Sequence, residues 1–186
     1  DDLHWNLSDT GWAKAAYSSL FGPWIAGARL FVHHTPRFDG KATLDMLARY
    51  PITTLCGAPT IFRVLVQQDL SAWSFPSLRD CVAAGEPLNP EVMEVWKDAT
   101  GLTIRDGYGQ TETSLMIGNY PGAEVRPGSM GLASPGFEVA VVGPDGDCGD
   151  CRNHLCHLPD IDSGSGHVLV DRRLHGGLPS LVRQRG

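Results

Sequence analysis

Long apolar runs and clusters of basic residues are both missing from this sequence of 186 residues. A membrane-spanning helix needs about 20 consecutive apolar residues, but the most apolar segment, Phe21–Val32, is interrupted by Pro23 and Arg29. The 15 Lys and Arg residues are outnumbered by 21 Asp and Glu, which gives a net charge of −6 and no basic patch for nucleic acid. With 42% hydrophobic and 19% charged residues, we expect a soluble globular protein without a membrane span or a nucleic-acid partner.

Cysteine is scarce and unevenly distributed. Cys56 and Cys81 lie in apolar segments, whereas Cys148, Cys151 and Cys156 fall close together. A secreted disulfide framework has an even number of regularly spaced cysteines, so five in this arrangement indicate a reducing, intracellular compartment. Cys56 and Cys81 are expected to be inert core thiols. The chain begins with Asp rather than Met, and no targeting segment is recognisable.

Between residues 39 and 142, helical and strand patterns alternate. Asp39 is expected to cap a helix that buries Leu44, Leu47 and Ala48 and ends before Pro51. A second helix is expected to start at Thr60, and a third follows Asn89 and ends at Gly101. The third helix is expected to bury Val92, Met93, Val95, Trp96 and Ala99. The predicted strands cover residues 52–56, 80–84, 102–105 and 137–142. Strands separated by helices predict an α/β fold with a parallel-rich sheet covered by helices.

Three segments are expected to follow the carboxyl ends of these strands, where open parallel sheets bind ligands. They cover residues 57–60, 85–88 and 106–112.

The segment Asp106–Glu112 is the most informative. Its two glycines permit close approach of a ligand to the backbone, and the Tyr108 ring is suited to stacking on a base. Thr111 and Glu112 offer the oxygen ligands that Mg²⁺ prefers when it accompanies phosphates. The residues alone leave two possibilities open. One is a purine nucleotide site; the other is a glycine-rich turn with Tyr108 in the core and Glu112 in solvent.

This segment resembles the core motif of the adenylate-forming superfamily, a Tyr-Gly-x-Thr-Glu run. Four further segments match in the family's order: residues 8–12, 57–60, 85–87 and 127–131. The variant Gly-Gln-Thr-Glu-Thr at 109–113, with Phe-Val-His-His at 31–34, is most similar to medium-chain acyl-CoA synthetases. The resemblance covers residues 1–147 and implies the central part of the AMP-binding domain, that is, part of the N-terminal domain of such an enzyme.

The resemblance also implies a role for each matching residue. Tyr108 would stack on adenine, Thr111 would bind the α-phosphate, and Glu112 would hold Mg²⁺; Thr111 and Glu112 are the implied catalytic residues. The implied nucleotide-binding residues are Gly85, Glu86, Pro87, Asp106, Gly107, Tyr108, Gly109, Gln110 and Thr111. The implied substrate pocket consists of Trp12, Gly57, Ala58 and Gly109.

Gly109 suggests which acid is activated. Relatives restricted to acetate resemble this segment but have Trp at that position. Glycine is expected to leave room for several methylenes, each worth ~0.8 kcal/mol on burial. The hypothesis is a preference for medium-length or aromatic acids, and Gly109→Trp should shorten the preferred chain.

The resemblance implies a ligase that joins a carboxylic acid to coenzyme A with ATP and Mg²⁺, through an acyl-adenylate, in the mitochondrial matrix. The family's phosphate loop and catalytic lysine are not recognisable here, so we expect a fragment that is inactive alone. Two alternatives remain: a non-catalytic module that binds ATP or a partner protein, and an adenylate-forming enzyme with another acceptor. Oligomeric state and exact acyl length are not indicated.

Residues 148–186 do not follow the family pattern and are expected to be a disordered tail rich in Cys, His and Gly. Only Val168–Val170 is typical of a strand there. The potential ligands Cys148, Cys151, His154, Cys156 and His157 allow a zinc site, but their spacing is cramped, and an accidental, unstructured tail is the other possibility.

Overall fold

The computed structural model describes residues 2–142, 148–149, 167–171 and 180–182. The chain forms two compact units, Asp1–Arg105 and Asp106–Gly186. The division falls within a strand rather than at residue 147, where the family resemblance ends. The possible zinc ligands Cys151, His154, Cys156 and His157 lie outside the described residues.

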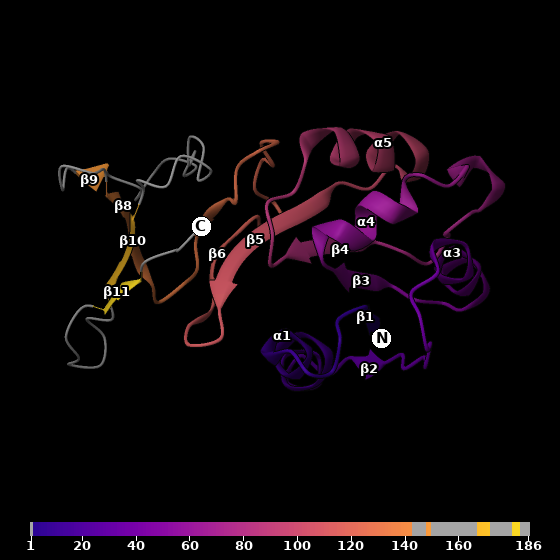
Figure 1. Ribbon diagram of the computed structural model, residues 1–186, viewed down its shortest axis with the longest axis horizontal. Helices are drawn as coiled ribbons and strands as arrows, with labels where there is room; N and C mark the ends of the chain where they lie inside the picture. The colour runs from indigo at the N-terminus through magenta and orange to yellow at the C-terminus, as the bar shows by residue number, and fades with distance from the viewer. Residues whose placement is uncertain (1, 143–147, 150–166, 172–179, 183–186) are drawn as a thin grey trace. The chain divides into compact units, whose positions relative to one another are not determined.

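Unit 1 contains four parallel strands, in the order β2-β1-β3-β4 (Figure 1). Their bounds are Leu3–Asn6 for β1, Arg29–Leu30 for β2, Thr54–Gly57 for β3 and Asp80–Ala84 for β4. The predicted parallel sheet is therefore confirmed. β4 has the predicted bounds, whereas β3 begins two residues later than predicted. The pattern did not predict β1. A strand was expected to end at His33 and His34, whereas β2 already ends at Leu30.

Two of the three longer helices of unit 1, α3 and α5, begin where capping residues predict, and α4 begins one residue before the predicted Thr60. α3 spans Gly40–Arg49, and the Asp39 carboxylate accepts a hydrogen bond from the Ala42 amide at 2.9 Å. α4 spans Pro59–Leu65, and the single-turn 3-10 helix η2 covers Leu70–Ala72. α5 spans Pro90–Thr100, after the N-cap Asn89 and before Gly101, whose φ of 74° suits only glycine well.

Trp96 is at the centre of the core of unit 1. Its indole is fully buried and packs edge-on against Phe62, with ring centroids 5.5 Å apart. Val92, Met93 and Trp96 are buried as predicted. The predicted burial of Val95 and Ala99 was wrong, since both are exposed. The face of α5 that meets the core is rotated by part of a turn from the face expected.

The same small rotation is seen in α3. Leu44 and Leu47 are buried as predicted, but Ala48 is exposed and Thr43 is buried. A helical period therefore located both helices correctly and misplaced the edge of each buried face.

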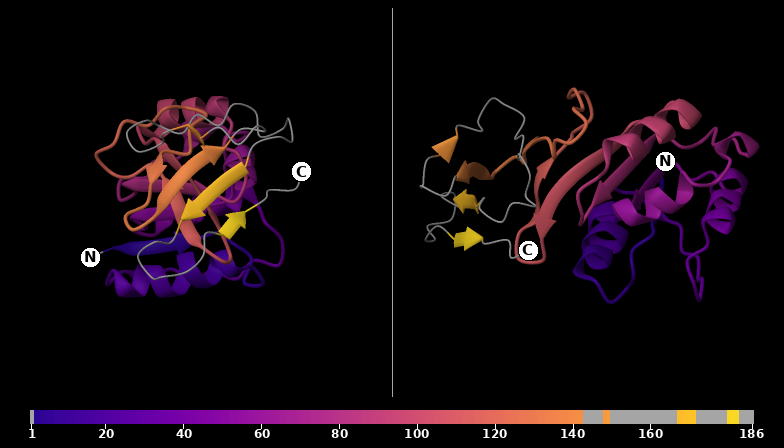
Figure 2. Two further views of the ribbon diagram at one scale, coloured as in Figure 1. Left: turned by 90° about the vertical axis from the view of Figure 1, so that its left-hand side faces the viewer. Right: turned by 45° about the horizontal axis from the view of Figure 1, so that its top comes forward.

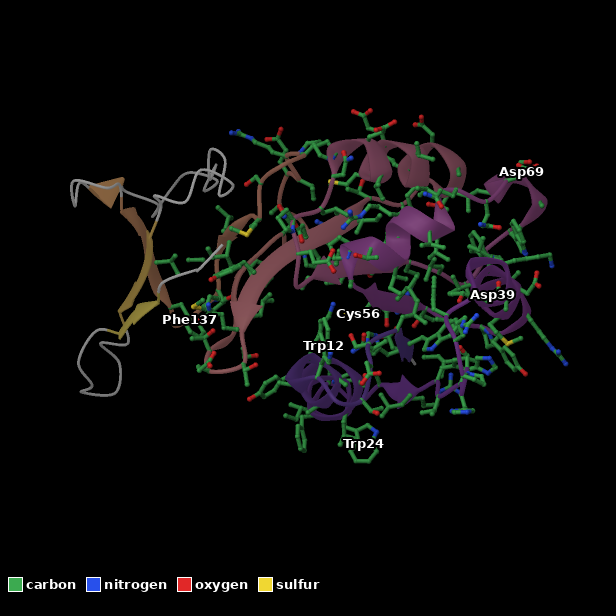
Figure 3. All side chains as sticks on the ribbon, in the orientation of Figure 1. Trp12, Trp24, Asp39, Cys56, Asp69 and Phe137 are labelled. Carbon is green, nitrogen blue, oxygen red and sulfur yellow. The ribbon has the colours of Figure 1, made fainter. Side chains whose placement is uncertain are left out.

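Residues 13–25 form one continuous helix that the sequence pattern did not predict (Figure 2). It consists of α1 (Ala13–Ala15), the π-helical η1 (Ala16–Phe21) and α2 (Gly22–Ile25). Pro23 lies near the end of this helix, just after the π-helical segment. Trp24 projects outward from this helix and is 62% exposed (Figure 3). Within the described part of the chain, no helix has the length and apolarity needed to cross a bilayer.

Unit 2 is built from antiparallel strands. β5 (Ile104–Gln110), which begins at the end of unit 1, pairs with β6 (Ser114–Gly118), and β6 pairs with β7 (Leu132–Ala133). A second sheet has the order β11-β10-β8-β9. Its strands are β8 (Glu138–Val142), β9 (Cys148–Gly149), β10 (His167–Asp171) and β11 (Ser180–Val182). The strand expected at Val168–Val170 is confirmed within β10.

His4 ties the first strand to its neighbours. Its Nε2 donates to the Ser18 carbonyl at 2.8 Å, because a carbonyl can only accept. Its Nδ1 lies 2.7 Å from the Thr54 hydroxyl and therefore accepts from it when the ring is neutral. Burial lowers the pKa of His4 below its ordinary value of 6.5, and the bond to Ser18 opposes this only in part.

We expect the chain to lose stability as the pH falls below about 6.5. A pKa that is lower in the folded state means that the unfolded chain binds the proton first, so the free energy of unfolding decreases with decreasing pH. His4→Gln should reduce this pH dependence and lower stability at pH 7.5 by about 1–2 kcal/mol. Urea denaturation between pH 5 and 8 measures both effects. His34→Gln, at an exposed position, is the control; an unchanged pH profile in His4→Gln would contradict the assignment.

Candidate functional site

The loops after β3 and β4 are brought together by one carboxylate. Glu86 Oε2 accepts a hydrogen bond from the Thr60 hydroxyl at 2.6 Å and another from Arg63 Nη2 at 2.8 Å. Both ends of the pair are partly exposed, so the ion pair itself contributes little stability. Its effect is geometric: it joins two of the three loops predicted from the sequence.

The loop at residues 85–87 starts from a glycine-only conformation. Gly85 has a φ of 109°, and a Cβ placed there would meet no atom within 4 Å. The backbone conformation, rather than a lack of room, therefore favours glycine. On the neighbouring strand, Gly57 is buried at the end of β3, and Ala58 immediately precedes α4.

Trp12 and Lys14 lie at the start of the long helix. Trp12 is 60% exposed and occupies the N-cap position of α1. Lys14 Nζ donates to the Ala84 carbonyl, at the end of β4, over 2.6 Å. The sequence pattern did not indicate Lys14; its only signal was its place two residues after the Ser-Asp-Thr-Gly-Trp segment.

In unit 2, residues 106–110 belong to a strand, so the predicted loop is wrong up to Gln110. The two glycines of the segment allow the close pairing of β5 with β6. A Cβ at Gly107 would lie 2.9 Å from the Leu115 side chain and 3.1 Å from the Ile117 carbonyl, and one at Gly109 would collide with the Ser114 carbonyl. The pairing is irregular between Tyr108 and Gly109, as in a β-bulge.

Gly109 therefore has a local reason to lack a side chain. The space into which its Cβ would point is filled by the Ser114 backbone, with the carbonyl carbon at 2.7 Å. The role of Gly109 in an acyl pocket stays a prediction, and Gly109→Trp would first disturb this hairpin.

A tight turn presents Thr111 and Glu112 at the tip of the hairpin, where both are exposed. The Thr113 amide donates to the Gln110 carbonyl at 3.2 Å, and the Gln110 amide donates to the Thr113 hydroxyl at 3.1 Å. Ser114 then takes a φ of 59°, which is uncommon outside glycine. Thr113 is buried and closes the turn; the sequence pattern indicated no such role for it.

Tyr108 is half-buried, so its ring is neither fully in the core nor fully exposed to a ligand. It packs against the apolar cluster formed by Met116, Ile117 and Val139. Its hydroxyl accepts a hydrogen bond from Gln110 Nε2 at 3.2 Å. Burial raises the pKa of Tyr108 and outweighs the opposing effect of this bond, so the phenol is neutral at pH 7. Stacking of a base on the part that remains exposed stays a prediction.

Asp106 is buried and organises the backbone around it. Its Oδ1 accepts from the Gly107 amide at 2.9 Å, and its carbonyl accepts from both the amide and Nδ2 of Asn119, each at 3.0 Å. These bonds give Asp106 and Asn119 a structural role. The nucleotide-binding role implied for Asp106 stays a prediction.

Mg²⁺ fits the tip of the hairpin as an ion that arrives with phosphates. No group of three or more His, Cys, Asp and Glu side chains able to hold a metal occurs in the described ranges. Mg²⁺ keeps several waters and is commonly held by one or two carboxylates together with substrate phosphates. The Glu112 carboxylate and the Thr111 hydroxyl are suitable donors for that arrangement.

The expected thiol behaviour is also visible in unit 1. Cys56 and Cys81 are unoxidised and buried in β3 and β4. Burial raises the pKa of Cys56 and raises that of Cys81 to about 12. Both thiols are therefore protonated and unreactive at neutral pH.

Protein families and curated sequences similar to this chain match most of its length. The family model described as AMP-binding enzyme matches residues 1–152. The human acyl-coenzyme A synthetase ACSM3, mitochondrial, is 54% identical over 146 residues, which cover 78% of this chain and 25% of the human protein. The rat protein of the same name is 54% identical over 176 residues, covering 91% of this chain and 30% of its own length.

Solved structures show the same relationship. An acyl-CoA synthetase from Brucella canis is 35% identical with a TM-score of 0.75, covering 92% of this chain and 30% of that one. The anthranilate CoA ligase AuaEII, solved with anthranoyl-AMP, is 30% identical with a TM-score of 0.74, covering 91% of this chain and 31% of that one. The chain thus spans between a quarter and a third of the length of these relatives.

We expect Gly109→Ala to destabilise the chain by about 1–3 kcal/mol, because the added methyl group meets backbone rather than a flexible side chain. Gly118→Ala on the paired strand is the matched control, since its Cβ would make only ordinary contacts at 3.4 Å or more. Urea denaturation of both variants at pH 7.5 measures the difference. Equal stability of the two variants would show that the hairpin does not require a glycine at 109.

Proposed function

This chain belongs to the AMP-binding enzyme family, and on that premise we propose that it provides nucleotide- and acid-binding elements of a medium-chain acyl-CoA synthetase. In the proposed reaction, the carboxylate of the acid attacks the α-phosphate of ATP and pyrophosphate leaves. The thiol of coenzyme A then attacks the acyl carbon of the adenylate and releases AMP. The observation that carries the proposal is the turn at 110–113, which holds Thr111 and Glu112 exposed at its tip.

The hairpin tip is proposed to act on the phosphates. The Thr111 hydroxyl would donate to an α-phosphate oxygen, where negative charge increases as the carboxylate attacks. Glu112 would hold Mg²⁺, whose charge neutralises the phosphates when it is bound. Neither side chain supplies the hydrogen bonds of Gln110 and Thr113 that close the turn.

The adenine-binding residues proposed for unit 1 are Gly85, Glu86 and Pro87. Those proposed for unit 2 are Tyr108 and its neighbours Asp106, Gly107 and Gln110. The open space around the Gly85 α-carbon supports close approach of a planar ring to that backbone. The part of the Tyr108 ring that remains exposed supports stacking.

The residues proposed to bind the acid and the thiol are Trp12, Gly57 and Ala58 in unit 1 and Gly109 in unit 2. The exposure of Trp12 supports a role at an entrance rather than in the core. A preference for medium-length or aromatic acids is consistent with relatives named for acyl-CoA synthesis and for the aromatic acid anthranilate.

The mitochondrion is the proposed location, because the human and rat relatives are named as mitochondrial proteins, and the matrix is the proposed compartment. A separate non-catalytic module is not favoured, because the relatives that match this segment are named synthetases. An acceptor other than coenzyme A is not favoured either, because the relatives cited are named for coenzyme A or its ligation.

The proposal predicts that the purified chain binds ATP more tightly with Mg²⁺ than without it. Glu112→Gln should weaken the binding that depends on Mg²⁺ by about tenfold, because one carboxylate ligand is lost. The control is Glu124→Gln, which changes an exposed acid of the same unit. Isothermal titration calorimetry with ATP, with and without Mg²⁺, measures the effect. Absence of ATP binding, or equal losses in the two variants, would contradict the proposed function.

A second prediction concerns turnover. The 186-residue chain should release no more pyrophosphate than a buffer control when supplied with ATP, Mg²⁺, coenzyme A and butyrate, hexanoate or benzoate. The physical reason is that the relatives use about three to four times this length of chain to surround the reacting groups. Sustained turnover in a continuous pyrophosphate assay would show that these residues suffice for catalysis.

A further inference from the structure

Lys14 connects the first helix to the start of the proposed nucleotide loop by a hydrogen bond. Its ammonium lies 2.6 Å from the Ala84 carbonyl oxygen, although the two residues are 70 positions apart in the sequence. Ala84 is the last residue of β4, and its carbonyl is part of the peptide that leads into Gly85. A fixed carbonyl there restricts the peptide from which the loop departs.

The ammonium is engaged by backbone rather than by an acid. The ion pairs in the described ranges are Lys41–Asp45, Arg63–Glu86, Arg79–Asp2 and Arg126–Glu124, and none includes Lys14. Hydrogen bonds from a charged donor are shorter and stronger than neutral ones. Lys14 is also partly buried, so its bond to Ala84 is partly shielded from water.

The neighbouring strand end lies close to the same charge. Burial raises the pKa of the Cys56 thiol, and the positive charge of Lys14 acts in the opposite direction. Cys56 is next to Gly57 at the end of β3, which pairs with β4. The ammonium therefore lies where two parallel strands end and the loops after them begin.

A second cation, Arg63, holds the centre of the same loop through Glu86. Glu86 accepts from Arg63 of α4 at 2.8 Å and from Thr60 at 2.6 Å. The loop at 85–87 is thus fixed at its start by Lys14 and at its centre by Arg63. Gly85, whose φ of 109° favours glycine, lies between these two attachments.

We propose that Lys14 is a positioning residue: it holds the loop at 85–87 in its binding shape before a nucleotide arrives. Because Lys14 is two residues from Trp12, it also links the proposed acid-binding side to the nucleotide loop. The part of this inference that concerns nucleotide affinity rests on the proposed function. The part that concerns the order of the loop does not.

The first experiment measures loop order in the intact chain. In Lys14→Met, which keeps length but loses the charge, the ¹⁵N order parameters of Gly85 and Glu86 should fall below about 0.6, while those of β3 stay near about 0.85. Lys14→Arg, which can still donate to Ala84, should restore them. Lys41→Met is the control, because Lys41 is an exposed lysine whose ion pair, with Asp45, lies within α3 and away from the loop at 85–87. Unchanged loop order in Lys14→Met would overturn the proposal, and so would an equal loss of order in β3 or an unfolded variant.

The second experiment measures ATP affinity by calorimetry on the same proteins. Lys14→Met should bind ATP about tenfold more weakly and Lys14→Arg within about twofold of the original chain, because a preset loop lowers the cost of ordering on binding. Equal affinities in Lys14→Met and the original chain would overturn the link to the nucleotide. If the original chain binds no ATP, the proposed function fails, and the order parameters still decide whether Lys14 positions the loop.

Discussion

Parallel pairing of β1, β3 and β4 is the constraint on which unit 1 depends. Two parallel neighbours cannot be joined by a short hairpin, so the chain must cross from one end of the sheet to the other between them. Every such crossing returns the next loop to the same edge. Loops that are 28 residues apart in sequence, at Gly57 and Gly85, therefore meet, and Glu86 can bind Thr60 and Arg63 directly.

In unit 2, the close approach of neighbouring strands has a different cause. Its strands are antiparallel, and close approach of β5 to β6 comes from residues without side chains. Gly107 and Gly109, on either side of Tyr108, are therefore needed by the hairpin itself. The segment singled out for its chemistry therefore also serves the close pairing of β5 with β6. Its glycines and the polar residues that follow them belong to one hairpin.

Local signals predicted much of unit 1. Asp39, Asn89 and Gly101 mark helix ends through interactions within a few residues, and β4 is bounded by clear turn residues. Features decided by distant contacts were not predictable in this way. The side of α5 that faces the core, the pairing of β1 and the contact of Lys14 with Ala84 all depend on where remote segments fold.

The segment from Asp106 to Gln110 shows why glycine misleads a sequence-based prediction. Glycine is rare in strands because it adds no packing, so Gly107 and Gly109 favoured a loop. The strand forms nevertheless, because a bulge and a close neighbour require those positions to be bare. The site residues were identified by resemblance to a family, whereas the positions that hold them, such as Thr113, became visible only in the structure.

In the turn at 110–113, the residues that close the turn differ from those whose side chains face solvent. Its closure is encoded by Gln110 and Thr113, while the side chains displayed to solvent are those of Thr111 and Glu112. Residue 110 takes part in the closure through its backbone amide and carbonyl, so the Thr113 hydroxyl is the side-chain group that these hydrogen bonds use. A position that carries no expected chemistry thus fixes the shape on which the neighbouring polar residues are carried.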